Sequence, residues 1–163
     1  MLQLFALILA VCLSFGAPPA SAAGNVDAAA LAAAVEKGRA EQLDVLAPRA
    51  FAAAVQASQN ATKEAERGRG TEKIAARVQE GEAALQKART VAASAQQTLG
   101  GVIKTRQDAL VAEAPKFSSE AWTKANDRFL QAMRENESGD LPNAQKRAAE
   151  AEVLLRDVEL TGI

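Results

Sequence analysis

The sequence predicts an all-α protein, an antiparallel helical bundle of about five helices. Beyond an apolar N-terminal segment, the chain is rich in Ala, Glu, Gln, Lys and Arg, which favour helices. No segment shows the sustained alternation of apolar and polar residues that a half-buried strand requires. Apolar or small residues instead recur every three or four positions, which is the spacing of one helix face.

The N-terminal segment has the features of a cleavable export signal. Residues 2–15 carry no charge and are too few for a permanent transmembrane helix, which needs about 20 residues. Pro18-Pro19 follows, and then Ala20-Ser21-Ala22, a small-x-small triplet that signal peptidase accepts. We therefore expect residues 1–22 to be removed and the mature protein to be periplasmic.

The single cysteine, Cys12, leaves one alternative open. The run Leu9-Ala10-Val11-Cys12 is similar to a lipobox, in which the cysteine is acylated. Val11 is bulky where that motif has Gly, Ala or Ser, so we favour the cleaved signal. The alternative is a lipid-anchored envelope protein, and we expect membrane association only if Cys12 carries lipid.

The first two helices are expected over residues 27–46 and 48–67. Ala47 ends the first helix, because the residue before a proline is driven out of the α region. Pro48 suits the first turn of the next helix, where its missing N–H would have no partner in any case. Gly68-Arg69-Gly70 then ends the second helix.

A long third helix is expected from an N-cap at Thr71 to Glu113. Gly100-Gly101 interrupts it at a cost of about 2 kcal/mol relative to two alanines. The apolar face resumes directly afterwards, so we expect a long helix that can bend there, not a true loop. Its small or apolar positions step by four and three without a miss: Ile74, Val78, Gly81, Leu85, Ala88, Ala92, Ala95, Leu99 and Val102.

Two further helices are expected after Ala114-Pro115. Ser118 is a predicted N-cap, which places Phe117 and Trp122 at the two positions of a hydrophobic staple. Ser138-Gly139-Asp140 is the predicted turn, with Asp140 as the next N-cap. Small or apolar residues also recur every three or four positions along one face of the last helix, and we call such a line a seam, here and in the long third helix. The seam of the last helix is Leu141, Ala144, Ala148, Ala151, Leu155 and Val158.

The two halves of the mature chain are similar in layout, which predicts two tandem three-helix repeats that share the long central helix. The expected units are residues 23–99 and 100–163. Repeats of this size each leave an apolar face that only a neighbour can bury. The correspondences are Ala47-Pro48 with Ala114-Pro115, Gly68 with Gly139, and Leu85 with Leu154.

The stretch from Ala114 to Leu155 has an Ala-Pro pair, an aromatic-led helix with Ala every three or four positions, a Gly-Asp turn and an Ala-rich helix. This pattern resembles a helical domain of unknown function. That domain occurs alone or precedes OmpA-like peptidoglycan-binding domains in Gram-negative envelope proteins. The resemblance implies an envelope protein with helical hairpins, but the OmpA-like domain itself has no counterpart in this sequence. The Gly139-Asp140 turn is also similar to that of tetratricopeptide hairpins, whose full spacing of large and small residues is not met.

The composition argues against catalysis, metal binding and nucleic-acid binding. After residue 22 the chain has no Cys, His or Tyr, so it lacks the favoured zinc ligands and the commonest general base. Its 19 basic and 20 acidic residues are interspersed, with no basic stripe for nucleic acid. We expect no enzyme activity, no catalytic residue, no cofactor and no metal site.

The remaining candidate for a site is an aromatic and Met stripe: Phe117, Trp122, Phe129 and Met133. Its regular spacing is explained by core packing in the second unit. The functional interpretation is a groove that accepts a partner helix. The favoured function is a non-enzymatic periplasmic scaffold, spacer or protein-interaction module whose partner is another envelope protein. The alternative is a ligand-binding or enzyme-accessory protein with a pocket between helices.

Overall fold

The computed structural model describes residues 20–161, and over this range the chain is all-α, as the sequence predicts. Five helices are long, whereas α2 and α5 have four residues each. No strand occurs among the described residues. The helices are α1 (Ala20–Ala40), α2 (Leu43–Leu46), α3 (Pro48–Glu66), α4 (Thr71–Val111), α5 (Ala114–Phe117), α6 (Ser119–Ser138) and α7 (Leu141–Thr161).

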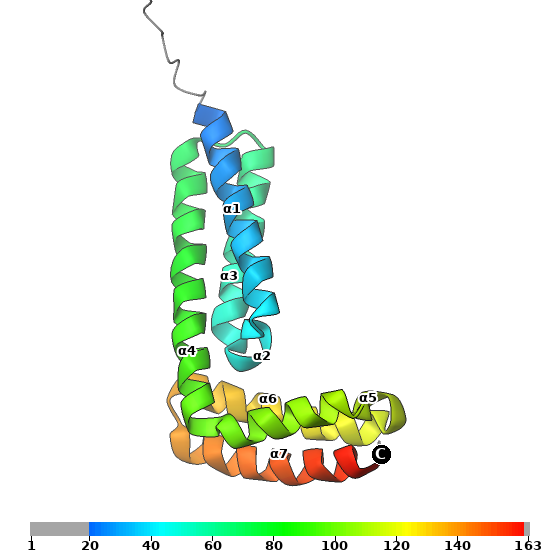
Figure 1. The fold of residues 1–163 in the computed structure, drawn as a ribbon. Helices are drawn as coiled ribbons and strands as arrows, with labels where there is room; N and C mark the ends of the chain where they lie inside the picture. The colour runs from blue at the N-terminus through cyan, green and yellow to red at the C-terminus, as the bar shows by residue number, and fades with distance from the viewer. Residues whose placement is uncertain (1–19, 162–163) are drawn as a thin grey trace, which may run out of the picture.

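The helices form two bundles that meet in an L (Figure 1). The first bundle consists of α1, α3 and the first part of α4, which pack against one another. The second consists of the rest of α4 with α6 and α7. One long helix therefore belongs to both bundles, and the corner of the L lies where α4 turns.

The turn in α4 is at the predicted interruption. Leu99 leaves the helical region (φ −126°, ψ 20°) immediately before Gly100-Gly101. The helix otherwise continues for 41 residues, so the expected long, bent helix is found. Its N-cap is Gly70 and not Thr71, which is the first helical residue; that detail of the prediction is wrong.

The seam of α4 is buried as predicted, apart from the half-buried Val78. Small residues there allow close packing against α1. A Cβ added to Gly81 would lie 2.6 Å from Leu31 Cδ2, so α1 and α4 approach as closely as they do only because this residue has no side chain. Gly38 is similarly enclosed, by Phe51 and Leu43. Gly38 and Gly81 thus serve close packing of the helices.

The helix expected over residues 27–46 is in fact two helices. It starts earlier, at Ala20, so the predicted cleavage site after Ala22 falls in the first turn of α1. It ends at Ala40, because Gln42 takes a left-handed conformation (φ 59°) before α2 begins. The predicted signal peptide and Cys12 lie otherwise outside the described residues.

The short helices α2 and α5 begin in the same way. Glu113, 71 positions after Gln42, is also left-handed (φ 54°). Each short helix then ends at an extended residue, Ala47 (φ −141°, ψ 61°) or Ser118 (φ −139°, ψ 57°), which starts the next long helix. The same backbone path therefore occurs twice, once in each bundle.

This geometry corrects the alignment of the two halves. Pro48 is the first residue of α3, whereas Pro115 lies inside the short helix α5. Ala47-Pro48 therefore corresponds to Ser118-Ser119 and not to Ala114-Pro115. The predicted pairing of Gly68 with Gly139 agrees with the structure: both follow a long helix with positive φ, 63° and 84°.

The last helix begins as expected. The backbone N–H of Asn143 donates to Asp140 Oδ1 over 3.2 Å, so Asp140 is the N-cap of α7. Pro142 lies in the first turn. The predicted seam of α7 is buried except at Leu141, which is 41% exposed.

Candidate functional site at the junction of the two bundles

The four residues of the predicted groove do not share a surface. Phe129 and Met133 are fully buried, and Trp122 is half-buried against the same core. Phe117 is 64% exposed and does not belong to that core. The structure therefore places the stripe in the interior and leaves only Phe117 outside, so these four residues line no common groove and Phe117 is not buried as a staple.

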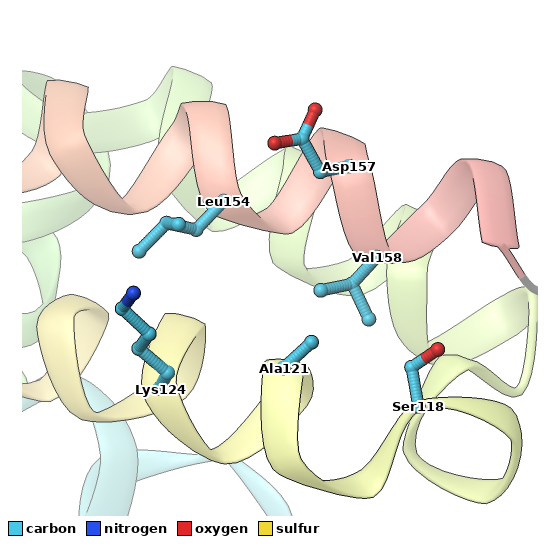
Figure 2. Close-up of a pocket in the computed structure, with 6 residues that line it drawn as sticks. All are labelled: Ser118, Ala121, Lys124, Leu154, Asp157 and Val158. Atoms are coloured by element: carbon cyan, nitrogen blue, oxygen red, sulfur yellow. The ribbon is translucent and has the colours of Figure 1, made fainter.

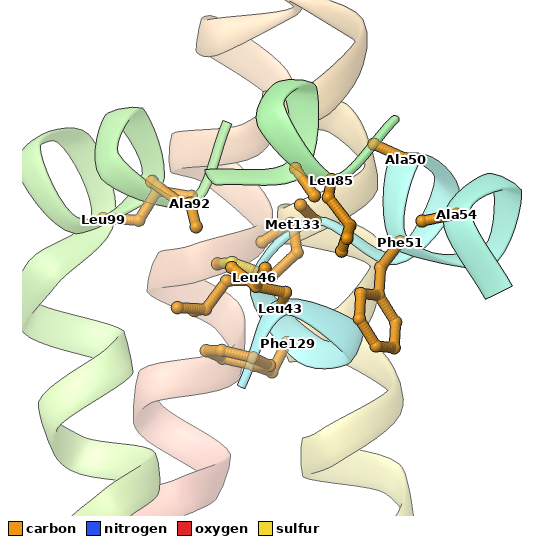
Figure 3. Packing of buried hydrophobic residues seen from close by; sticks show 14 of the residues in the cluster. Leu43, Leu46, Ala50, Phe51, Ala54, Leu85, Ala92, Leu99, Phe129 and Met133 are labelled. Atoms are coloured by element: carbon orange, nitrogen blue, oxygen red, sulfur yellow. The ribbon is translucent and has the colours of Figure 1, made fainter. Parts of the chain in front are cut away.

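Phe129 and Met133 instead help to fill the corner of the L. They lie close to Leu43 and Leu46, which come from α2 at the end of the first bundle (Figure 3). All four side chains are buried. Apolar contact between the two bundles is therefore concentrated where α2 meets α6.

A carboxylate of the second bundle caps a helix of the first. Glu137, near the end of α6, accepts hydrogen bonds from the backbone N–H groups of Arg49 (2.9 Å) and Ala50 (2.6 Å) in α3. Negative charge at a helix N-terminus is stabilised by the helix dipole and by its free N–H groups. Glu137 thus links α6 to α3 across 87 to 88 residues of sequence.

The first turn of α3 is fully satisfied by this arrangement. A helix begins with N–H groups that have no partner inside the helix. Pro48 has no N–H, and that of Phe51 bonds to the carbonyl of Ala47 over 2.9 Å. The two that remain, those of Arg49 and Ala50, both donate to Glu137. No side chain of α3's own N-cap could do this, because that residue is alanine.

A polar pair lies beside the bend in α4. Thr98 Oγ1 is 3.1 Å from Asn136 Oδ1 and 2.8 Å from the carbonyl of Ser94. Asn136 is only 6% exposed, and its Nδ2 has no hydrogen-bond partner among the described residues. The hydrogen bond between Thr98 and Asn136 therefore links the end of α6 to the residue that precedes the bend.

Arg106 occupies an otherwise apolar position on the second part of α4. Its guanidinium lies over the rings of Phe129 (5.2 Å) and Trp122 (5.6 Å), and its Nε donates to Asn126 Oδ1 over 2.9 Å. Burial lowers the pKa of Arg106 from its ordinary value, and the nearby carboxylate of Asp44 in α2 opposes that shift. Arginine stays charged in proteins, and the Asp44 carboxylate of the other bundle favours that charge.

Sequence reasoning missed Glu137, Asn136 and Arg106 as junction residues. Nothing local distinguishes Glu137 from Glu135, because its partner amides lie on a distant helix. The one available signal was Ala47-Pro48, a helix start with no capping side chain of its own. Such a start needs an acceptor from elsewhere in the fold.

The hollows of the described surface are small and open. Three of them have volumes of about 330–380 Å³, near the lower end of the roughly 300–1,000 Å³ typical of ligand pockets. Another, of about 230 Å³, lies between α6 and α7. Lys124 reaches toward Leu154 there, whereas the Asp157 carboxylate points away from α6 (Figure 2). The lining residues are Ser118, Ala121, Lys124, Leu154, Asp157 and Val158. The predicted alternative of a ligand pocket gains little from this geometry.

Two further observations concern the described residues alone. Within residues 20–161, no three His, Cys, Asp or Glu side chains are grouped so that they could hold a metal ion. No helix in the same range combines the length and apolar character needed to span a bilayer.

Comparison with known proteins adds no assignment. No family model matches the chain, and no curated protein or solved structure does so either. The likeness to the helical domain of envelope proteins therefore stays a prediction.

Proposed function

We propose that the protein is a non-enzymatic helical scaffold or spacer of the cell envelope, which holds two three-helix bundles in a fixed relative orientation. The observation that carries this proposal is the bond of Glu137 to the first turn of α3. A flexible linker between the two bundles would need no such contact. A rigid arrangement of the two bundles, which we call the bracket, needs contacts beyond the helix that they share.

Three further features support a bracket. α4 runs through both bundles, so no loop separates them. The corner is filled by buried apolar side chains from α2 and α6. The described hollows are open, and the buried seams between the long helices consist largely of Ala. Location in the periplasm and a partner in the envelope follow from the N-terminal signal and remain part of the proposal.

Rigidity can be measured with spin labels at the two tips of the L. Glu72 lies at the tip of the first bundle and Lys116 at that of the second, and both are exposed. Each is changed to cysteine, with Cys12→Ser so that the labels are the only thiols. A single narrow distance distribution is expected from double electron–electron resonance, and a broad one would contradict the bracket.

Removal of the capping carboxylate should loosen the corner. Glu137→Ala leaves two helix N–H groups without an acceptor, so we expect a loss of about 1–3 kcal/mol in the free energy of unfolding and a broader distance distribution. Glu135→Ala, in the same turn of α6 but without a contact across the junction, is the matched control. If the two variants behaved alike, Glu137 would not be what fixes the bundles.

A further inference from the structure

The two bundles differ in what covers equivalent ends. The end of the first bundle that carries α2 is covered by the second bundle, and Leu46 there is 3% exposed. The equivalent end of the second bundle carries α5 and forms the tip of the L (Figure 1). Phe117, 71 positions after Leu46, is 64% exposed at that tip. A large apolar side chain therefore lies uncovered where its counterpart is buried.

The helix that follows shows the same contrast. The N–H groups of Arg49 and Ala50 in α3 donate to Glu137. Their counterparts in α6 are those of Glu120 and Ala121, for which the described residues supply no acceptor. Ala121 is also exposed, whereas Ala50 is buried.

The other tip of the molecule carries the complement of these groups. Glu66, 71 positions before Glu137, occupies the same place at the end of α3 that Glu137 has near the end of α6. It is exposed at the tip of the first bundle. A carboxylate in the capping position is thus present on the first bundle, and no N–H group of the described residues donates to it.

A receiving surface is present on the same bundle. Within one molecule, α2 of the first bundle packs against the second bundle, on the face of α4 and α6 that carries Arg106 and Phe129. The residues 71 positions earlier, Val35 and Ser58, line an open hollow of about 330 Å³ between α1 and α3. The hollow therefore occupies the position on the first bundle that is equivalent to the one on the second bundle where α2 packs. Its lining is Ala32, Ala33, Val35, Glu36, Arg39, Val55, Ser58 and Gln59.

We propose that this surface binds the α5 tip of a second copy of the chain, head to tail, and so repeats between molecules the junction seen within one. Phe117 of one copy enters the hollow between α1 and α3 of the next, and Glu66 of that copy accepts from the N–H groups of Glu120 and Ala121. Glu36, which pairs with Arg39 in the hollow, is opposite in charge to Lys116, and Lys116 pairs with Glu113 beside α5. Because the two surfaces are different, the contact is heterologous. Each dimer therefore keeps a free hollow at one end and a free α5 tip at the other, as in an open chain of subunits.

The test uses two variants that each block one surface. Phe117→Glu places a charge on the tip, and Ala33→Arg fills the hollow; both positions are exposed, so we expect unchanged melting curves. Protein purified after export is followed by sedimentation velocity over a concentration series, with intact mass measured in parallel. The unaltered protein should show a mean mass that rises with concentration beyond that of one mature chain, as the intact-mass measurement gives it. Each variant alone should stay monomeric.

The decisive arm is a mixture of the two variants in equal amounts. One retains a working hollow and the other a working tip, so the mixture should form dimers and nothing larger. Glu66→Gln should weaken self-association about tenfold, because glutamine keeps an acceptor oxygen but lacks the charge that strengthens both hydrogen bonds. Val153→Glu, at an exposed apolar position on α7 away from both surfaces, is the control and should associate like the unaltered protein.

Several outcomes would overturn the proposal. They are a monomer at every concentration, variants that associate like the unaltered protein, or a mixture that stays monomeric, which would indicate a symmetric contact. Self-association goes beyond the scaffold function and does not depend on it. A monomer with a narrow distance between its tips would refute the association and leave the bracket intact.

Discussion

At the scale of single residues, the contributions to this fold depend on surroundings that residue type does not reveal. Phe117 and Phe129 are both aromatic residues of the second unit, yet the first is mostly exposed and the second lies under Arg106 in the core. Glu137 and Glu135 likewise differ only in what faces them. The residues that hold the junction are therefore defined by their partners on the other bundle.

This contrast predicts a large difference between two similar substitutions. Phe129→Ala should lower the free energy of unfolding by about 3–5 kcal/mol, because it leaves a cavity where two bundles and a cation–π contact meet. Phe117→Ala should change it by less than about 0.5 kcal/mol. Urea unfolding followed by circular dichroism, in dilute protein so that association does not contribute, measures both. Comparable losses for the two would show that Phe117 is buried in solution.

At the scale of elements, α4 contains glycines with opposite roles. Gly81 lies in the seam, where α1 approaches so closely that an added Cβ would meet Leu31. Gly100, beside the bend, has no atom within 4 Å of an added Cβ. It has no positive φ that would require glycine either. The helix thus tolerates one glycine as a flexible point and needs the other for packing.

The same substitution at these two positions should therefore have opposite signs. Gly100→Ala should stabilise the protein by about 1 kcal/mol, since alanine loses less backbone entropy in a helix and meets no obstacle. Gly81→Ala should destabilise it by about 1–3 kcal/mol, because Leu31 or α1 must move. Thermal and urea unfolding of the two variants compare them directly. Destabilisation by Gly100→Ala would mean that the bend needs glycine itself.

At the scale of the whole molecule, the protein has more length than a compact bundle of the same helices would have. Its two bundles meet only at one corner, so most of the side surface of each remains exposed (Figure 1). At this corner the second bundle covers the end of the first. It makes apolar contact with α2, and its Glu137 accepts hydrogen bonds from the first turn of α3. This extended arrangement is the basis of the proposed scaffold function.

The proposed location in the envelope can be tested on the whole protein. Material from osmotic shock of the native host should contain a chain that begins at Ala23 and carries no lipid, because Ala20-Ser21-Ala22 is the expected cleavage site and Val11 disrupts the lipobox. Intact-mass spectrometry of this fraction measures both features. A diacylglyceryl group on Cys12 would instead establish the lipid-anchored alternative, and a chain retained whole in the cytoplasm would refute export.

The sequence by itself determined the helical class, the seams of α4 and α7, the start of α3 at Pro48, the cap at Asp140 and the bend beside Gly100-Gly101. These depend on propensity, periodicity and turn chemistry, which act over a few residues. Only the tertiary structure decided that Phe129 is buried and Phe117 exposed, that α2 and α5 are separate helices, and that Glu137 caps α3. Each of these depends on which surfaces meet at the corner, and contacts between residues some 90 positions apart leave no periodic trace in the chain.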